Sequence, residues 1–274
     1  MLVQGKDSKL FAAKNNDYPN HPVACRFYDA KVGIDPKDSM YLKFLRHLGK
    51  KHASIVHTWE LFMDDTDNIE IFQEYCGNGS LQKYLEDKRL EEKESSLYAW
   101  QLLRGMDFLG DIGIAHREIH PKNLVLRAAN EYNVLKISNF RQAVVYWSVA
   151  DNDVTFIPCV SADQQSSDGN NYQAPEVYGN PKKEEFDPIV ADTWSYGAVL
   201  YFMATKKYPY DPTKQSDNLD EEIQASVKKI SAFSDEGKDL VSCLLRTNTG
   251  ERMPIGFVEK SPWFEGAKKV SVPH

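Results

Sequence analysis

The sequence predicts an α+β protein with two lobes, a small β-rich N-terminal lobe with one main helix and a larger, mainly helical C-terminal lobe. The chain has 274 residues, which is enough for two modest lobes or one large domain. Residues 1–30 and 69–75 contain the short alternating apolar runs that are typical of strands. Residues 81–115 instead fit two helices, so the second lobe is expected to begin near residue 80.

The composition indicates a soluble globular protein, because hydrophobic residues make up 42% and charged residues 27% of the chain. The net charge of -7 argues against a general nucleic-acid binder. No apolar run approaches the length of a membrane span, and the polar start lacks a signal-peptide core. We therefore expect a cytoplasmic protein that has neither nucleic acid nor a membrane as its partner.

The four cysteines, Cys25, Cys76, Cys159 and Cys243, lie far apart and include no C-x-x-C pair. This spacing predicts reduced thiols rather than a zinc site or a disulfide framework. Cys159 falls in a polar stretch that we expect to be mobile, so its thiol is the one most open to redox chemistry.

The main helix of the first lobe is expected at about residues 37–50, where Met40, Phe44, Leu45 and Leu48 form an apolar face. Lysines and an arginine make the same segment basic. A basic amphipathic helix can bind a calmodulin-type partner, whereas the simpler interpretation is a helix packed on a small sheet with solvated lysines.

A Gly-Asn-Gly-Ser turn at residues 77–80 is the expected boundary between the lobes. Glycine and asparagine permit the turn, and Ser80 can cap the helix that follows. We therefore divide a single domain into an N-lobe at residues 1–76, a turn at 77–79 and a C-lobe at 80–274.

The rest of the chain is organised around two runs, HREIHPKNLVL at residues 116–126 and LKISNFR at residues 135–141. Hydrophobic residues flank the polar ones, which predicts a strand, a turn and a strand. The first run matches the catalytic loop of protein kinases, H-R-D-L-x-x-x-x-N, and the second matches the strand that leads into their D-F-G motif. The chain therefore resembles a protein kinase.

Further kinase-like motifs follow in the family's order, so the resemblance covers nearly the whole chain and implies a two-lobed protein-kinase-like fold. These motifs are the residues before the catalytic loop at 97–115, YQAPEV at 172–177, DTWSYGAVLY at 192–201, YPYD at 208–211 and SPWF at 261–264. The sequence is most similar to the calcium/calmodulin-dependent kinase group, including the testis-specific serine kinases.

Several catalytic positions depart from the family, namely Arg26, Tyr41, Glu118, His120, Asn139 and Arg141. Glu118 replaces the Asp that orients the substrate hydroxyl, and its extra methylene moves the carboxylate by about an ångström. Asn139 replaces a magnesium-binding Asp and brings no negative charge. By the same resemblance, His120 removes a cation near the γ-phosphate and Arg141 removes a glycine that lets the chain turn.

The resemblance also implies the residues of an ATP site, which are Gly5, Arg26, Gln73, Glu74, Cys76 and Asn123. Arg26 keeps the charge of the usual lysine but is longer, planar and forked. The helix glutamate that would pair with it is absent, with Tyr41 near its place. Gln73 is the expected gatekeeper, residues 74–76 are the hinge, and Asn123 keeps one of two magnesium-ligand positions. We expect this vestigial site to bind ATP and Mg²⁺ weakly or not at all.

The residues that support packing are retained, namely His116, Arg117, Phe140, Glu176, Asp192 and Arg252. The resemblance places His116 and Phe140 in the hydrophobic spine between the lobes, with the polar Thr58 at a further spine position. It also predicts a buried Glu176–Arg252 pair. Arg117 could receive a phosphate or an acidic side chain from residues 139–176, a polar segment that we expect to be partly disordered.

Because the departures affect the general base, one metal ligand, the phosphate-binding lysine and its glutamate partner, we predict a catalytically inactive kinase-like domain, a pseudokinase, and no enzyme. It would act as a scaffold or an allosteric regulator through protein–protein contacts, with an active kinase as one partner. Two alternatives stay open. The chain could be a weak or atypical Ser/Thr protein kinase that uses Glu118 as base, Arg26 as cation and Asn123 as one metal ligand. It could instead be a nucleotide-binding switch without turnover.

Overall fold

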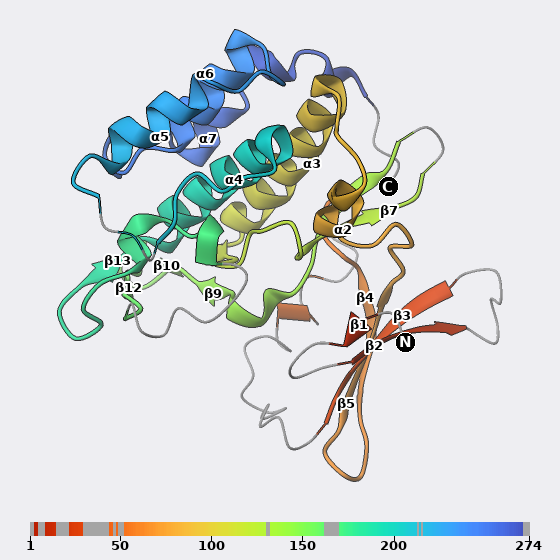
Figure 1. Cartoon of the computed structure of the whole chain (residues 1–274). Coiled ribbons are helices and arrows are strands. Elements are labelled where there is room, and N and C mark those ends of the chain that lie inside the picture. Colours follow the sequence, from red (N-terminus) through yellow and green to blue (C-terminus); the bar gives the residue numbers. More distant parts are fainter. Residues whose placement is uncertain are drawn as a thin grey trace.

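The structure, a computed structural model, has a small lobe built on a β-sheet and a larger lobe built on helices (Figure 1). It confirms the fold class predicted from the sequence. The described residues are 3–4, 9–14, 22–29, 44–45, 48, 52–129, 132–161, 170–212, 214 and 216–270. The predictions for Gly5, for Tyr41 and for most of the basic helix at 37–50 lie outside the described residues.

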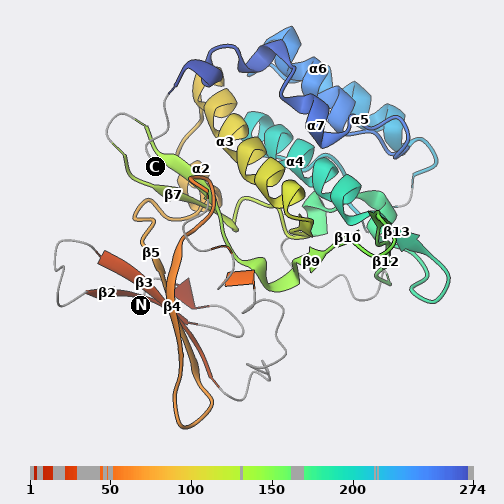
Figure 2. The same cartoon turned by 180° about the vertical axis from the view of Figure 1, so that it is seen from behind.

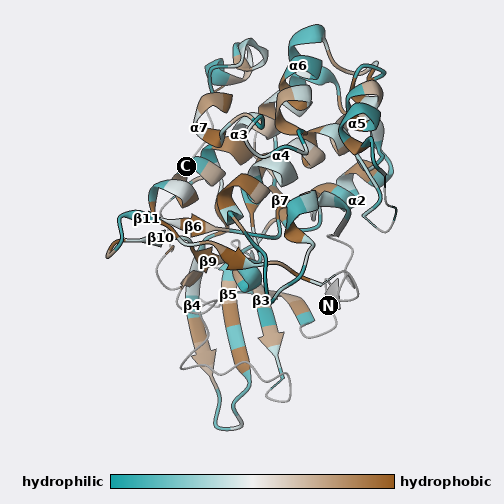
Figure 3. Cartoon of the chain, turned by 90° about the vertical axis from the view of Figure 1, so that its left-hand side faces the viewer, coloured by the Kyte–Doolittle hydropathy of each residue, from teal (hydrophilic) through white to brown (hydrophobic). Residues whose placement is uncertain are grey.

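The N-lobe sheet is antiparallel, with strand order β1-β2-β3-β5-β4. Its strands are β1 (Val3–Gln4), β2 (Lys9–Lys14), β3 (Pro22–Tyr28), β4 (Thr58–Met63) and β5 (Ile69–Glu74). Along β5 the side chains of Ile69 and Ile71 are buried, whereas Glu70 and Phe72 are half-buried, because successive residues of a strand face opposite sides. Figure 3 shows apolar and polar residues alternating along these strands.

The helical residues Phe44, Leu45 and Leu48 belong to the apolar face predicted for the main helix of the N-lobe, and all three are buried. They join the same hydrophobic core as Ile69 and Ile71 of the sheet. The apolar face is therefore confirmed at these three residues.

The C-lobe is organised around helices, and α3 and α4 lie side by side in its middle (Figures 1 and 2). The helices are α2 (Leu81–Glu86), α3 (Glu92–Asp111), α4 (Pro188–Thr205), α5 (Leu219–Val227), α6 (Asp235–Leu244) and α7 (Ile255–Val258). Helix α4 is buried on all sides over most of its length, as expected of a central helix. It begins where the Asp187 carboxylate accepts hydrogen bonds from the backbone N–H groups of Ile189 and Val190.

Short strands and 3-10 turns complete the C-lobe. The strand pairs are β6 (Ile114–Ala115) with β9 (Val144–Val145), β7 (Leu124–Arg127) with β8 (Val134–Ile137), β10 (Trp147–Ser148) with β11 (Asp153–Val154), and β12 (Ile157–Pro158) with β13 (Glu185–Phe186). The 3-10 turns are η2 (Phe140–Gln142), η4 (Asn170–Tyr172), η5 (Pro175–Val177), η6 (Pro262–Phe264) and η7 (Ala267–Lys269). The β7–β8 hairpin brings residues 116–123 beside residues 138–141, so the two sequence runs meet in space.

Two sets of contacts join the segment before β4 and the end of β5 to the β7–β8 hairpin. Backbone hydrogen bonds link Val56 N–H to Ile137 O at 2.9 Å and Ile137 N–H to Ser54 O at 2.7 Å. The Glu74 carboxylate pairs with Lys136 Nζ at 2.8 Å and with Arg127 Nε at 3.3 Å. These contacts hold the hinge end of the sheet against the C-lobe.

The turn at residues 77–80 ends as predicted, because Ser80 Oγ accepts a hydrogen bond from Lys83 N–H and caps α2. Gly79 has φ +72°, a left-handed conformation that glycine adopts without strain. None of the helices within the described ranges has both the length and the apolar character needed to cross a bilayer.

Candidate active site

Helix α4 anchors the loop at residues 116–123 through the side chain of Asp192. The Asp192 carboxylate accepts hydrogen bonds from the backbone N–H groups of His116 at 2.6 Å and Arg117 at 2.8 Å. Arg117 has φ 65°, a conformation that costs energy for a residue with a β-carbon. The two bonds to Asp192 offset this cost and set the direction in which the loop leaves β6.

His116 and Phe140 form the contact that the sequence predicted. Their ring centroids lie 5.0 Å apart in an edge-to-face arrangement, and both residues are buried. His116 Nε2 donates to Ser138 O at 3.0 Å, while its Nδ1 accepts from Glu118 N–H at 3.2 Å. Burial lowers the pKa of His116 to about 3, so the imidazole is neutral at physiological pH.

Three of the sequence-predicted site residues converge at the end of this loop. Asn139 Nδ2 donates to Glu118 Oε2 at 3.0 Å and to Asn123 Oδ1 at 3.1 Å. Asn123 Nδ2 donates in turn to the backbone oxygen of Glu118 at 2.9 Å. Glu118, Asn123 and Asn139 therefore form one hydrogen-bonded group, which we call the Glu-Asn-Asn cluster.

Burial raises the pKa of the Glu118 carboxyl above its ordinary value, because the charged form loses solvation. A hydrogen bond from Asn123 and the charges of Arg141 and Arg117 act in the opposite direction. Arg141 itself is exposed. A carboxylate with a raised pKa is a stronger proton acceptor, which is the property a general base requires.

His120 is buried rather than presented as a side chain at the loop surface. Its Nε2 lies 2.9 Å from Asn123 Nδ2, and its ring stacks on Tyr172 with centroids 6.0 Å apart. The residue that replaces the family's loop cation thus supports Asn123 and packs against η4.

The cluster does not fit the magnesium ion that a kinase-like site implies. Mg²⁺ prefers oxygen ligands in octahedral geometry, usually with carboxylates among them. Here the oxygen of Asn123 faces an amide N–H, and Glu118 supplies the carboxylate of the cluster. Nowhere in the described ranges do three His, Cys, Asp or Glu side chains gather closely enough to hold a metal ion.

The predicted gatekeeper and hinge residues lie at the end of β5. Gln73 is buried, and its Nε2 donates to Thr58 Oγ1 at 3.0 Å, so the polar Thr58 is paired within the core. Burial and the charge of Glu74 raise the pKa of the Cys76 thiol to about 12, so this thiol stays protonated. Arg26 is half-buried in β3, opposite Leu10 of β2 and Ile71 of β5.

Lys136 was missed by the sequence reasoning. It is 4% exposed, within a strand whose other residues are apolar, and it pairs with the Glu74 carboxylate. A lysine inside an apolar run such as Val134–Ile137 is the signal that could have found it, because a buried charge needs a partner.

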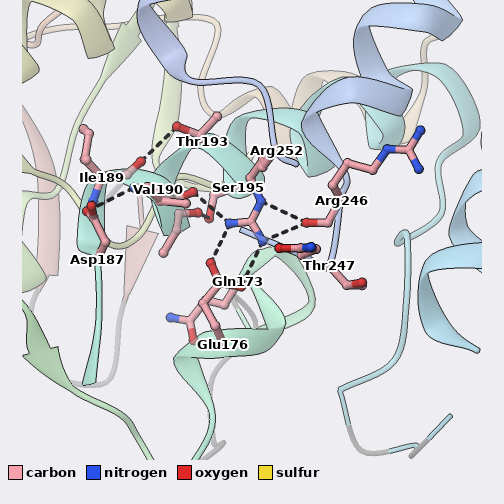
Figure 4. Close-up of polar contacts among 12 residues, drawn as sticks. Gln173, Glu176, Asp187, Ile189, Val190, Thr193, Ser195, Arg246, Thr247 and Arg252 are labelled. Carbon is pink, nitrogen blue, oxygen red and sulfur yellow. Dashed lines mark hydrogen bonds and ion pairs between the residues drawn. The ribbon is translucent and has the colours of Figure 1, made fainter. Parts of the chain in front are cut away.

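The predicted pair between Glu176 and Arg252 is confirmed (Figure 4). The Arg252 guanidinium donates from Nη1 to Glu176 Oε1 at 2.5 Å and from Nη2 to Glu176 Oε2 at 2.9 Å. It also donates to the backbone oxygens of Val190 and Arg246 and lies over the Trp194 ring, 5.1 Å from its centroid. This site is a support for the loop that ends at residue 176.

The expectation for Cys159 is wrong. The thiol is buried and donates to Glu176 O at 3.3 Å, next to the backbone pairing of Val160 with Tyr178. Burial raises the pKa of this thiol, which disfavours the reactive thiolate. Of the polar segment 139–176, residues 139–161 include the short strands β9 to β12, and residues 162–169 lie outside the described ranges.

Comparison with known proteins shows which family this chain matches. A family model described as protein kinase domain matches residues 2–264. CBL-interacting serine/threonine-protein kinase 20 of Arabidopsis thaliana is 27% identical over 278 residues, covering 100% of this chain and 59% of the relative. The carbon catabolite-derepressing protein kinase of Secale cereale is 29% identical over 272 residues, covering 97% of this chain and 50% of the relative. The chain thus spans between half and three fifths of the length of these relatives.

These relatives contradict the prediction that the chain is no enzyme, since each of them is named as a protein kinase. The loop that carries the departing residues is nevertheless anchored by Asp192 and by the His116–Phe140 contact. The likeness to the calcium/calmodulin-dependent and testis-specific groups stays a prediction, because these relatives are CBL-interacting and carbon catabolite-derepressing kinases.

Proposed function

The chain belongs to the protein kinase domain family, and on this premise we propose that it is an atypical serine/threonine protein kinase with Glu118 as general base. The observation that best supports the proposal is the hydrogen bond from Asn139 Nδ2 to Glu118 Oε2 at 3.0 Å. This bond orients a carboxylate on a loop whose backbone is anchored by Asp192.

In the proposed reaction, the hydroxyl oxygen of a substrate serine or threonine forms a bond to the γ-phosphorus of ATP. The bond between that phosphorus and the bridging oxygen to the β-phosphate breaks, and ADP leaves with the electron pair. Glu118 takes the hydroxyl proton, and its raised pKa favours this transfer at neutral pH. Asn139 acts as a positioning residue, because it holds Glu118 without touching the substrate.

We propose that ATP binds weakly and without a tightly held magnesium ion. The backbone of residues 74–76 would hold the adenine edge, and Arg26 would act on the phosphates in place of the usual lysine. Arg26 is half-buried in β3, where it lies opposite Ile71 of β5. A weak site predicts slow turnover, since phosphoryl transfer depends on positioning and charge neutralisation.

The proposals for the whole protein are coarser, because the chain spans only part of its relatives. We propose a cytoplasmic location, protein partners rather than nucleic acid or membrane, and lobes at residues 1–76 and 80–274. Relatives named CBL-interacting support a protein regulator as one partner. The turn at Gly79 and the capping of α2 by Ser80 support a boundary close to residues 77–79.

Phosphate transfer from labelled ATP to a mixture of serine- and threonine-containing peptides tests the proposal. The wild-type chain, Glu118→Gln and Glu60→Gln are purified side by side. Glu118→Gln keeps the shape of the side chain but removes the base, so the rate should fall by about 10²-fold. Glu60→Gln removes an exposed carboxylate of β4 and should leave the rate unchanged.

Equal rates in the wild-type chain and Glu118→Gln would assign the labelling to a contaminating kinase and end the proposal. ATP binding without any phosphate transfer would instead point to the nucleotide-binding switch. Melting curves of the three proteins establish that a lost rate does not reflect a lost fold.

A further inference from the structure

We infer that the side-chain amide of Asn139 takes the place of a divalent cation in this site, linking Glu118 to Asn123 and closing the site to magnesium. The inference rests on the proposed function in that it concerns the same residues. It names the form of the nucleotide that the site takes, which is a nucleoside triphosphate without a bound divalent cation.

The orientation of the two amides follows from the hydrogen-bond partners. The backbone oxygen of Glu118 can only accept, and it lies 2.9 Å from one side-chain atom of Asn123, so that atom must be Nδ2. The oxygen Oδ1 of Asn123 then faces Asn139. If Asn139 turned its own oxygen toward this point, three oxygens would meet, an arrangement that is stable only with a proton or a cation between them. The structure has the NH₂ group of Asn139 at this point instead, where it donates to both neighbouring oxygens.

The position of His120 is compatible with this assignment. Its Nε2 lies 2.9 Å from Asn123 Nδ2, where it can accept the second hydrogen of the amide. The backbone of Asn123 is paired as well, since its N–H donates to His120 O and its oxygen accepts from Ser138. Asn123 is 8% exposed, so its side chain cannot turn without breaking several bonds.

The backbone of Asn139 keeps its amide in place. The residue has φ 67° and ψ 67°, a left-handed conformation that asparagine tolerates better than most residues with a side chain. The next residue, Phe140, is 1% exposed and packs on the His116 ring. The backbone after Asn139 is therefore anchored by Phe140, and this anchor keeps the Asn139 amide beside Glu118 and Asn123.

A cation between Glu118 and Asn123 would be repelled by the NH₂ group of Asn139. The NH₂ group of Asn139 carries a partial positive charge and already occupies one oxygen of Glu118 and the oxygen of Asn123. To admit Mg²⁺, the side-chain amide of Asn139 would have to rotate by about 180° and lose its hydrogen bonds to Glu118 and Asn123. Arg141 instead supplies positive charge near Glu118, and this charge lowers the pKa of that carboxyl.

The first arm of the test measures binding of Mn²⁺ alone, from the paramagnetic resonance signal of free Mn²⁺ during titration. Asn139→Asp exchanges the amide for a carboxylate and should bind Mn²⁺ at least about tenfold more tightly than the wild-type chain. Asn152→Asp is the matched control, because Asn152 also has a positive φ, of 51°, but is exposed in the turn between β10 and β11. It should bind Mn²⁺ no better than the wild-type chain.

Wild-type binding of Mn²⁺ as tight as that of Asn139→Asp would overturn the inference. If Asn139→Asp fails to fold by circular dichroism, Asn139→Ala serves in its place. This change removes the amide that occupies Asn123 Oδ1 without adding charge. Mn²⁺ affinity should then rise above that of the wild-type chain, and an unchanged affinity would overturn the inference.

The second arm titrates ATP into the wild-type chain with Mg²⁺ and with a chelator. The dissociation constants should agree within about twofold, whereas Asn139→Asp should bind ATP about tenfold more tightly with Mg²⁺ than without it. A wild-type affinity that falls tenfold on chelation would contradict the inference. Absence of ATP binding under both conditions would end the proposed function, while the Mn²⁺ comparison would still decide the inference.

Discussion

Arg252 holds the carboxylate of Glu176 with two nitrogens, at 2.5 and 2.9 Å, although the two residues are 76 positions apart. The Arg252 side chain is 1% exposed and that of Glu176 is 21% exposed. The same guanidinium reaches Val190 O in α4 and Arg246 O near the end of α6. One buried cation thus ties η5, α4 and the loop after α6 together.

Arg252→Met should lower the free energy of unfolding by about 3–5 kcal/mol, because it leaves the Glu176 carboxylate without its partner. Urea unfolding followed by circular dichroism measures the change. Lys214→Met is a suitable control, since it removes a pair with Asp211 in which the lysine side chain is 80% exposed. Similar losses in the two variants would contradict a special role for the buried pair.

Asp192 predicts a pH dependence of stability. Burial raises its pKa from 3.8 to about 7, against the effect of its two backbone hydrogen bonds. The folded state therefore holds a proton that the unfolded state releases, so this carboxyl's contribution to stability decreases as pH rises from about 4 to about 7. Asp192→Asn should lack this slope.

The comparison requires unfolding free energies of both proteins at several pH values across that window. The asparagine turns one N–H toward a backbone N–H of the loop, so the variant should also lose about 1–3 kcal/mol at acidic pH. Parallel curves for the two proteins would show that Asp192 does not titrate there.

Protonation of Glu118 should determine how the rate of phosphate transfer falls at acidic pH, which we call the acid limb of the pH profile. The base works only when ionised, and burial raises its pKa above 4.5, so the rate should fall as pH drops through that raised value. Arg141 lowers the pKa of Glu118, so Arg141→Gln should move the acid limb to higher pH. Arg104→Gln, which changes a cation paired with Asp107, should leave the limb in place. An unmoved limb in Arg141→Gln would argue against Glu118 as the titrating base.

Gln73 and Thr58 predict a non-additive pair of mutations. Thr58→Val leaves the buried amide of Gln73 without its acceptor and should cost about 1–3 kcal/mol. Combining it with Gln73→Leu replaces both partners by apolar groups, so the double variant should be more stable than the sum of single effects predicts. Thermal or urea unfolding of the four proteins completes the cycle. Strict additivity would mean that the hydrogen bond contributes nothing.

The fold could be predicted because its signals are local. Alternation along residues 69–75, the apolar face of Phe44, Leu45 and Leu48, and the capping residue Ser80 each specify an element through neighbours in the sequence. The Glu176–Arg252 and His116–Phe140 contacts were predicted from a resemblance across the whole chain, and the structure confirms both.

The site was harder to predict because its chemistry depends on hydrogen bonds between residues that are remote in the sequence. The departures at Glu118 and Asn139 are visible in the sequence, but the hydrogen bond between them is not, since 21 residues separate them. The burial of Cys159 was missed for the same reason: its polar neighbours in sequence say nothing of Glu176 and Tyr178, which approach from the next segment.

The sequence by itself determined the α+β class, the two lobes and the positions of the kinase-like motifs, because periodicity, caps and motif order act over short distances. Only the tertiary structure decided that Lys136 neutralises Glu74, that His120 supports Asn123, and that the Asn139 amide joins Glu118 to Asn123. The physical reason is that hydrogen bonds and buried ion pairs depend on distances of about 3 Å, which exist only once remote segments have packed together.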